Sequence, residues 1–228
     1  MGSNYKISYT VDMVFCIDCT GSMDNILEIV KNNALNFYND VVQSMSAKGK
    51  NVDKLRVRIV AFRDYIADGD NAMMVTDFFT LPDDAMNFER CVHSLVAKGG
   101  GDEPEDGLEA LAYAMRSNWN TEGMKKRQVI VVWTDASTHP LGYGARMNNY
   151  PQGMAGSMQE LTAWWGDKQN EGYVDQRAKR LLLFAPDKPG WSDISNNWDN
   201  VIHFPSEAGN GLKELEYGQI IATIANSI

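Results

Sequence analysis

The sequence predicts an α/β fold: a three-layer, Rossmann-like, doubly wound sheet that is mostly parallel. Apolar runs of strand length alternate along the 228-residue chain with longer stretches in which apolar residues recur at helical spacing. Strands that alternate with helices in this way form a parallel sheet with helices on both faces. Two of the apolar runs end in an acid, Asp18 and Asp135, which is typical of a ligand site beyond the carboxyl ends of the strands.

The first half of the chain opens with a predicted strand over residues 11–17, which are mostly apolar and end at Asp18. A long helix is expected over residues 25–45, where apolar residues recur close to helical spacing. Residues 55–62 and 73–81 are predicted strands. The connection between these two strands is too short for a crossover helix, so we expect them to pair antiparallel.

The second half continues the alternation. Helices are predicted over residues 83–96 and, after Gly99-Gly100-Gly101, over residues 105–117. Asp102 is placed to act as the N-cap of the second helix, with Glu105 completing a capping box. The remaining predicted elements are a strand at 129–133, a long surface loop at 137–157, a helix at 158–165, strands at 181–184 and 201–204, and a helix at 212–225.

These elements predict a six-stranded sheet with the strand order 3-2-1-4-5-6 and one antiparallel edge strand. No linker divides the chain, so we expect residues 1–228 to form a single domain.

The composition excludes several kinds of protein. A net charge of -9 argues against binding to the phosphate backbone of nucleic acids. The sequence shows neither an apolar run long enough to cross a bilayer nor the apolar core of a signal peptide, so we expect no membrane partner. The three cysteines, Cys16, Cys19 and Cys91, are too few for a disulfide scaffold and favour a reducing, cytoplasmic location.

The end of the first strand carries the polar residues from which we predict a site. Asp18 is followed on alternate positions by Thr20 and Ser22. In the predicted strand order, strands 1 and 4 are neighbours at the crevice, so Asp18 and Asp135 should meet there. Two desolvated carboxylates repel each other, and a cation would relieve the repulsion. Carboxylate and hydroxyl oxygens suit Mg²⁺, with Mn²⁺ or Ca²⁺ as alternatives.

The segment Asp18-Cys19-Thr20-Gly21-Ser22 resembles the D-x-[ST]-x-S signature of von Willebrand factor A domains, which is called the metal-ion-dependent adhesion site. The resemblance covers nearly the whole chain, because the order of the elements is similar too. It implies that Thr20 and Ser22 bind Mg²⁺ directly, while Asp18 and Asp135 act largely through water. It also implies that a carboxylate from a protein partner completes the metal shell.

One position departs from this family pattern. Where the family usually offers a Thr, this chain has G-G-G-D-E-P-E-D, residues 99–106. It thereby resembles a subgroup of intracellular A domains, found with atypical kinases and in bacteria, that also carry F-R-D-Y and T-D-A-x-x-H, as residues 62–65 and 134–139 do here. We hypothesise that Asp102 belongs to the metal site, either as a ligand or through water. A third carboxylate would raise metal affinity and lower the attraction for an acidic partner, so the site would be more structural or switch-like than adhesive.

Each of these residues has a simpler interpretation. Asp18, Thr20 and Ser22 could cap the following helix, and Asp102 could be only an N-cap. Cys16 and Cys19 form a C-x-x-C, but the first lies within the predicted buried strand and not at a helix N-terminus, which argues against redox chemistry.

Three further residues lie near the predicted site. His139 is expected to make a contact within its loop, with a catalytic role as the alternative. Arg63 and Asp64 are expected either to form a local ion pair or to belong to a partner surface.

The function predicted from these residues is a metal-dependent protein-interaction module without catalytic or cofactor-binding residues. One alternative is a Mg²⁺-dependent phosphatase or hydrolase. However, Thr20 occupies the position of the second acid in the D-x-D motif of haloacid-dehalogenase phosphatases, and the chain has no P-loop. The other alternative is a scaffold with an inactive metal site.

Overall fold

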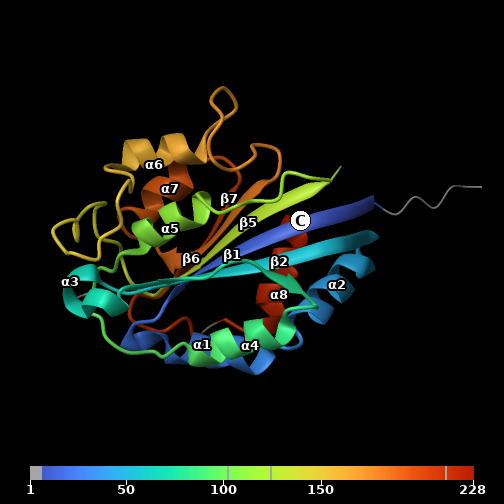
Figure 1. The fold of residues 1–228 in the computed structure, drawn as a ribbon, viewed down its shortest axis with the longest axis horizontal. Helices are drawn as coiled ribbons and strands as arrows, with labels where there is room; N and C mark the ends of the chain where they lie inside the picture. Colours follow the sequence, from blue (N-terminus) through green and yellow to red (C-terminus); the bar gives the residue numbers. More distant parts are fainter. Residues whose placement is uncertain (1–6, 102, 124, 214) are drawn as a thin grey trace, which may run out of the picture.

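A seven-stranded sheet forms the middle layer of the computed structural model, which describes residues 7–101, 103–123, 125–213 and 215–228 (Figure 1). The strand order is β3-β2-β1-β5-β6-β7, and β4 also pairs with β2. Only β3 and β4 run antiparallel to their neighbour β2, so the predicted order and the antiparallel edge are confirmed. The strands are β1 (Ile7–Asp18), β2 (Lys50–Phe62), β3 (Met73–Val75), β4 (Phe79–Leu81), β5 (Lys126–Trp133), β6 (Lys179–Pro186) and β7 (Val201–Ser206).

The predicted edge strand over residues 73–81 is two short strands, and the prediction of six strands is wrong for this reason. Between them, the Thr76 hydroxyl accepts a hydrogen bond from the Ile59 backbone N–H at 3.0 Å, so a side chain takes the place of a ladder carbonyl. The carbonyl of Thr76 instead accepts from Arg58 Nε at 2.6 Å. The pairing with β2 therefore stops after β3 and starts again at β4.

Helices cover both faces of the sheet, and the short α3 lies at its carboxyl end (Figure 1). Within the described residues, none of the helices combines the length and the apolar composition needed to span a membrane. On one face lie α1 (Asp24–Asn33), α2 (Phe37–Ala47), α4 (Ala85–Ser94) and α8 (Tyr217–Ser227), and on the other α5 (Gly107–Met115), α6 (Met158–Trp165) and α7 (Trp191–Asn197). The short elements are α3 (Tyr65–Asp68) and the 3₁₀ turns η1 (Gly21–Met23) and η2 (Gly69–Asn71).

The helix predictions differ from the structure in several places, among them the last helix, which begins at Tyr217 and not at residue 212. The helix expected over residues 25–45 is broken into α1 and α2, because Asn33 turns its side chain back to donate to the Ile29 carbonyl at 2.8 Å and tighter turns follow. The helix α7 is not predicted from the sequence, because the two buried apolar residues of this helix, Trp191 and Ile194, are too few to define a period.

The apolar side chains of β1 alternate between two cores, one on each face of the sheet. A central parallel strand covered by helices on both faces needs apolar residues on both sides, which explains the nearly continuous apolar run. Val11, Met13, Phe15 and Ile17 belong to the core beneath α1, α2, α4 and α8, and Val14 and Cys16 belong to the core beneath α5, α6 and α7.

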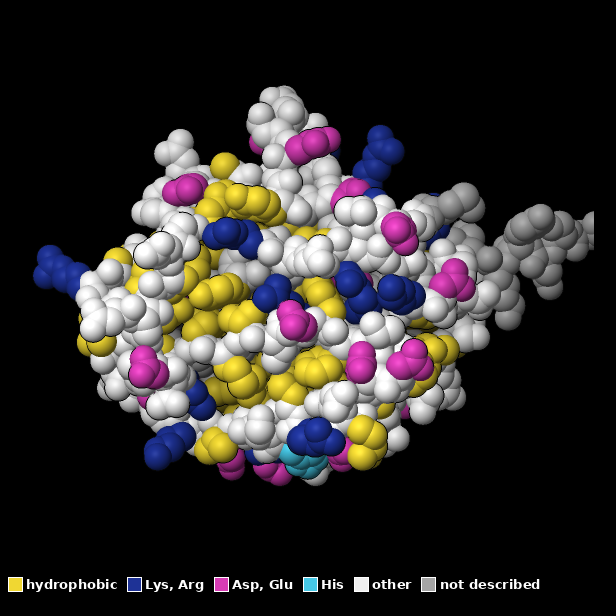
Figure 2. Space-filling model, in the orientation of Figure 1, with side chains coloured by type: hydrophobic (Ala, Val, Ile, Leu, Met, Phe, Trp, Pro, Cys, Tyr) yellow, Lys and Arg dark blue, Asp and Glu magenta, His cyan; other side chains and the backbone are white. Residues whose placement is uncertain are grey.

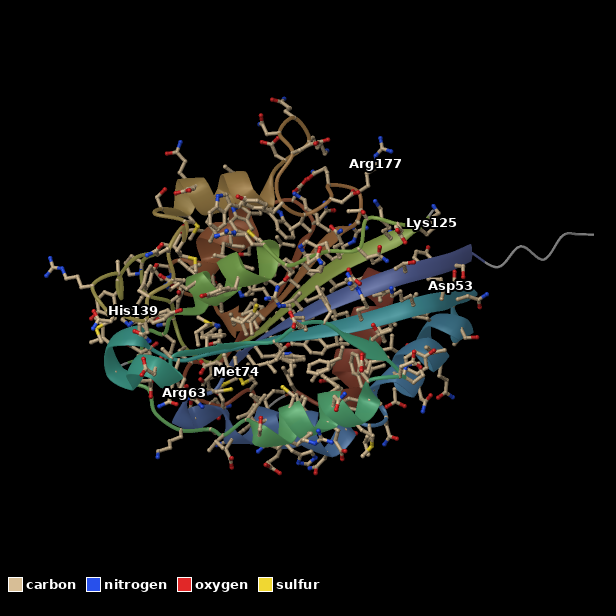
Figure 3. All side chains as sticks on the ribbon, viewed as in Figure 1. Asp53, Arg63, Met74, Lys125, His139 and Arg177 are labelled. Carbon is tan, nitrogen blue, oxygen red and sulfur yellow. The ribbon has the colours of Figure 1, made fainter. Side chains whose placement is uncertain are left out.

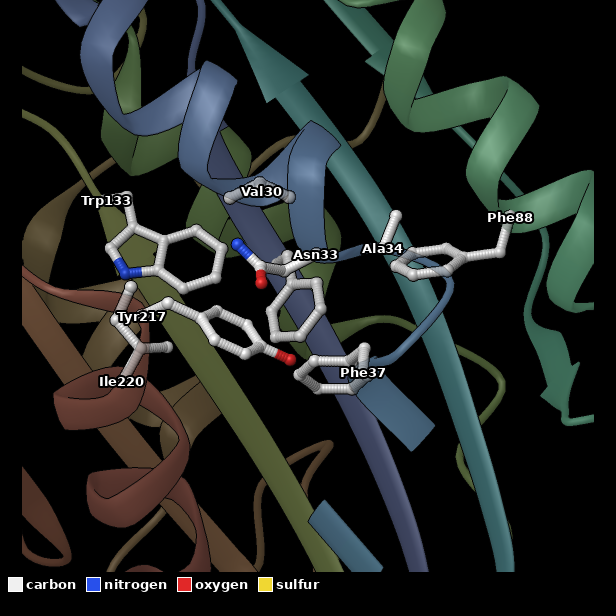
Figure 4. Close-up of a pocket in the computed structure, with 9 residues that line it drawn as sticks. Val30, Asn33, Ala34, Phe37, Phe88, Trp133, Tyr217 and Ile220 are labelled. Carbon is white, nitrogen blue, oxygen red and sulfur yellow. The ribbon is translucent and has the colours of Figure 1, made fainter. Parts of the chain in front are cut away.

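A cluster of aromatic side chains connects β1 and β5 to the first core. The Phe15 ring lies edge-on to Phe37, with centroids 5.4 Å apart, and 5.0 Å from Trp133. Beside these rings is a pocket of about 20 Å³, closed on its sides by α1 and α8 (Figure 4). That volume holds about one water molecule. Trp133 is the last residue of β5, so this packing determines where the polar residues that follow it lie.

We expect Phe15→Ala to destabilise the protein by about 3–5 kcal/mol, because it removes a buried ring and leaves a cavity between β1, Phe37 and Trp133. Met86→Ala is the matched control on α4, since Met86 is 63% exposed and its truncation should change the free energy of unfolding by no more than about 0.5 kcal/mol. Urea unfolding of the two variants measures the difference. Equal losses would contradict the assignment of Phe15 to the core.

Candidate functional site

The structure brings Asp18 and Asp135 together at the carboxyl ends of β1 and β5. The register pairs Ile17 with Trp133, so the residues that follow each strand leave the sheet side by side. Thr134 Oγ1 donates a hydrogen bond to Asp18 Oδ2 at 2.7 Å and ties the two strand ends to each other. Asp18 is 0% exposed and Asp135 is 1% exposed, so both acids lie beneath the surface.

The two predicted hydroxyls complete this group. Asp18 Oδ1 accepts hydrogen bonds from the hydroxyl of Thr20 at 2.6 Å and from its backbone N–H at 2.8 Å. Ser22 Oγ donates to Asp135 Oδ1 at 2.8 Å, and the Gly211 backbone N–H donates to Asp135 Oδ2 at 2.7 Å. Thr20 is buried whereas Ser22 is exposed, so the group is open to solvent on the side of Ser22.

The interpretation of these residues as helix caps is wrong. Thr20 is the N-cap of η1 and Met23 is the N-cap of α1, and neither makes a side-chain capping hydrogen bond. The hydroxyls of Thr20 and Ser22 donate to the two acids and therefore leave the helix N-termini alone.

The loop before α5 differs from the prediction. Asp102 lies outside the described residues. The helix begins at Gly107 with Asp106 as its N-cap, so the predicted start at residue 105, with Glu105 in a capping box, is wrong. Glu105 instead belongs to the extended segment that leads to the helix.

Glu105 is a residue of the candidate site that the sequence analysis missed. Its backbone forms a short parallel bridge beyond the end of β5: its N–H donates to the Ser137 carbonyl at 3.0 Å, and its carbonyl accepts from the His139 N–H at 3.0 Å. A Cβ built on Gly100 would lie 2.8 Å from Glu105 Oε1 and 3.1 Å from Thr20 Cγ2. Glu105 and Thr20 thus lie against the same small space at Gly100.

The carboxyl group of Glu105 is buried, and no hydrogen bond from a described residue to its Oε2 offsets the cost of removing that oxygen from water. The residue is 3% exposed, and its Oε2 has no hydrogen-bond partner among the described residues. A buried carboxylate oxygen without a donor is costly and is rare in folded proteins. This oxygen is therefore a candidate to bind a ligand or a cation.

The pKa values of the acids show how unfavourable their charges are together. Burial raises the pKa of Asp18 to about 6. The hydrogen bonds from Thr20 and Thr134 lower this pKa, and the charge of Asp135 raises it. Burial raises the pKa of Glu105 to about 9, and the acids around it, Asp18, Asp64, Asp68 and Asp106, raise it further. The site thus disfavours its own negative charges.

The donor set fits a hard divalent cation. Within the described part of the chain, no three side chains of His, Cys, Asp or Glu come close enough together to hold a metal by themselves. The candidate site instead combines the carboxylates of Asp18 and Asp135 with the hydroxyls of Thr20 and Ser22, and Glu105 lies beside Thr20. Oxygen atoms of this kind suit Mg²⁺ better than Zn²⁺.

Arg63 holds the loops around the site in place. Its guanidinium donates to four backbone carbonyls, and the bonds to Cys19 and Lys98 tie the loop after β1 to the segment before the glycines. The bonds to Asn71 and Val96 have lengths of 2.7 Å each. Of the two alternatives for Arg63 and Asp64, the local ion pair is wrong, because the arginine binds carbonyls and Asp64 caps α3 through the N–H groups of its first turn. The alternative, a place in a partner surface, stays a prediction.

Asp64 also contacts His139, which lies in the loop after β5. The two side chains approach to 3.0 Å between His139 Nε2 and Asp64 Oδ2, and both residues are buried. The ring of Tyr143 stacks on His139 with centroids 3.8 Å apart. These contacts agree with the interpretation of His139 as a residue that holds its loop against α3.

The two cysteines of the C-x-x-C are buried, free thiols. Burial raises the pKa of Cys19 to about 12 and that of Cys16 further above its usual range, so neither thiol ionises readily. A reactive redox pair needs the opposite shift.

A family model described as von Willebrand factor A domain matches residues 12–142, more than half of the 228 residues. The matched range contains both strand ends and the loop that carries Glu105.

Individual relatives are distant. The chain is 26% identical over 148 residues to an alpha-protein kinase, vwkA, of Dictyostelium discoideum, and the match covers 65% of this chain but 22% of the kinase. Two crystal structures of the pilus adhesin SpaC from Lactobacillus rhamnosus GG have TM-scores of 0.52 and 0.51 at 14% and 15% identity, covering 94% of this chain and 30% of the adhesin. These likenesses show a shared fold.

We expect Glu105→Gln to change how stability depends on pH in the presence of EDTA. The unfolded chain ionises Glu105 near pH 4.5, whereas the native protein holds its proton up to about pH 9, so the native state binds more protons between these values and loses stability as pH rises. The slope from this one group is at most about 1.4 kcal/mol per pH unit. The variant should lack that contribution and gain stability relative to the wild type as pH increases.

Urea unfolding between pH 5 and 9 measures this difference, with Glu171→Gln, in an exposed loop, as the control. Parallel curves for the wild type and Glu105→Gln would show that Glu105 is solvated and not held in the site.

Proposed function

Because this chain belongs to the von Willebrand factor A domain family, we propose that it is a protein-interaction module whose binding depends on a divalent cation, Mg²⁺ first, with Mn²⁺ or Ca²⁺ as alternatives. We further propose that residues 1–228 act as one domain in the cytoplasm. The continuous sheet from β3 to β7 and the three free cysteines support these two proposals.

The observation that carries the proposal is the unpartnered oxygen of Glu105 beside a group of acids and hydroxyls. Asp18 and Asp135 are desolvated at adjacent strand ends, and among the described residues their donors are neutral: two threonine hydroxyls, a serine hydroxyl and backbone N–H groups. Neutral donors reduce the cost of burying a carboxylate but do not cancel its charge. A cation bound between these acids would cancel the charge.

The roles of the residues follow from their positions. Thr20 and Ser22 would turn their hydroxyl oxygens from the acids to the metal, while Asp18 and Asp135 would hold water or the metal. Bound Mg²⁺ would supply a positive centre that attracts a carboxylate of the partner. Ser22 is exposed, so the partner would approach from that side.

Glu105 and Asp102 are two of the four acids in residues 99–106, and we propose them as the candidates for a third carboxylate. Glu105 lies against Thr20, whereas Asp102 lies outside the described residues. A third carboxylate makes the site more negative, which raises metal affinity and weakens the attraction for an acidic partner. We therefore propose that the site works as a metal-dependent switch of this surface more than as a strong anchor.

The surface around the site supports a protein partner. The loop after β5 packs closely on α3, since a Cβ on Gly144 would lie 2.5 Å from Tyr65 Cβ and the rings of Tyr65 and Tyr150 are 5.1 Å apart. This rigid rim presents two large apolar side chains to solvent, Ile66 at 50% and Tyr143 at 47% exposure. Exposed apolar residues beside a polar site are typical of protein interfaces.

We expect the wild type to bind Mg²⁺ and Asp18→Ala to lose at least about tenfold in affinity, because the acid that organises Thr20 and Thr134 is removed. Isothermal titration with MgCl₂ measures this, and MnCl₂ and CaCl₂ distinguish the alternatives. Asp53→Asn is the matched control, because Asp53 is exposed at the other end of the sheet (Figure 3).

The same titration assigns the loop acid. Weaker binding in Glu105→Gln but not in Asp102→Ala or Asp102→Thr would make Glu105 the third carboxylate, and the reverse would assign Asp102. No heat of binding in the wild type, at concentrations that saturate known magnesium proteins, would refute the metal site.

We expect the protein to retain its partner from a lysate of the source organism in Mg²⁺ but not in EDTA, and Asp18→Ala to retain it in neither. Tyr143→Ser should weaken capture without changing Mg²⁺ affinity, because it alters the rim and not the metal group. Capture that is equal in Mg²⁺, in EDTA and in Asp18→Ala would contradict metal-dependent recognition, and Asp53→Asn controls for the effect of a surface charge.

A further inference from the structure

A pocket on the α5 side of the sheet contains two arginines that form no ion pair with the described acids. It has a volume of about 290 Å³ and lies between β2, α5 and the loop at residues 151–154. Its polar lining comes from Arg58, Tyr113, Arg116 and Gln152, and none of the lining residues is an Asp or Glu. None of the candidate metal-site residues lines it either.

Arg58 enters the pocket from β2. Its Nε donates to the Thr76 carbonyl at 2.6 Å and its Nη1 to Ser117 Oγ at 2.8 Å, which leaves the other N–H groups of the five on a guanidinium for another acceptor. Burial lowers the pKa of Arg58, which means that its charge is partly desolvated. Arg58 forms no ion pair with the described residues, and the acid with the strongest influence on it is Asp77, which is exposed.

Arg116 enters from the C-terminal end of α5. Its Nη1 donates to the Gly153 carbonyl at 2.8 Å, and its guanidinium lies 5.4 Å from the ring centroid of Trp164. These two contacts hold the side chain beside the pocket. Like Arg58, Arg116 forms no ion pair within the described part of the chain.

Tyr113 lines the pocket together with the two arginines. It precedes Arg116 by three residues and therefore shares its side of the helix. Burial raises the pKa of Tyr113, while the charges of Arg116 and Arg58 lower it, so its hydroxyl experiences the field of both guanidiniums.

The lining of this pocket combines two arginines with no acid, although acidic residues outnumber Lys and Arg by 30 to 21 in the chain. Figure 2 shows Lys and Arg side chains grouped across the middle of the face that β2 and α5 present. Two guanidiniums and a tyrosine hydroxyl thus line one small pocket in which no carboxylate neutralises the positive charge.

We propose that this pocket binds the phosphate group of a small phosphate monoester. Guanidiniums bind phosphate oxygens through paired, charge-assisted hydrogen bonds, and a tyrosine hydroxyl adds a third donor. The volume is at the lower limit of small-molecule sites, which suits a phosphate with a small organic group. Ala112, Pro151 and Met154 provide an apolar wall for that group.

The test is isothermal titration of the full chain with inorganic phosphate and with phenyl phosphate, in EDTA so that no divalent cation takes part. We expect saturable binding, tighter for phenyl phosphate. Arg116→Gln should weaken it about tenfold, the effect of losing one charged donor. Tyr113→Phe should weaken it less. Asp77→Asn should tighten it, because the acid that competes for Arg58 is removed.

Arg177→Gln is the matched control, since Arg177 is an exposed arginine that does not line the pocket. Asp18→Ala should leave phosphate binding unchanged, so the result is independent of the metal site. The proposal is overturned if neither probe binds saturably, or if Arg116→Gln and Arg177→Gln bind equally well. Binding of inorganic phosphate with exclusion of phenyl phosphate would overturn the monoester assignment.

Discussion

The complete burial of Asp18 at the end of β1 is the constraint on which the candidate site depends. A desolvated carboxylate must find donors, and it finds them in Thr20 on the next loop and in Thr134 on the neighbouring strand end. The first contact determines the course of the loop after β1. The second holds the end of β5 beside it and so determines where Asp135 lies.

Negative charge accumulates at this edge of the sheet because the guanidinium of Arg63, which lies nearby, does not pair with the acids. It donates to four backbone carbonyls instead and thereby holds the loops in place without neutralising an acid. The acids around Glu105 raise its pKa further above the value that burial alone would produce. The protein thus accepts an electrostatic cost in one place, which is typical of a functional site and not of a part of the fold that only packs.

The fold was largely predictable, and the errors have local causes. The alternation of strands with helices along the chain and the short connection after β2 led to the correct order of the sheet. The break between α1 and α2 at Asn33 and the break between β3 and β4 at Thr76 were not predicted. At each position a side chain replaces or ends a backbone hydrogen-bond pattern, which the period of apolar residues does not reveal. Glu105 was misassigned because D-E-P-E matches a capping box, whereas its bridge to Thr138 spans distant parts of the chain.

Most elements, and the acids that end two of them, could be read from the chain, because the period of apolar residues and the properties of single side chains are local. Which polar groups remain without partners depends instead on the folded arrangement. The burial of Glu105 and the meeting of Arg58 with Arg116 depend on segments that are far apart in the chain. Desolvation is a property of the assembled surroundings of a group, and no short stretch of residues contains it.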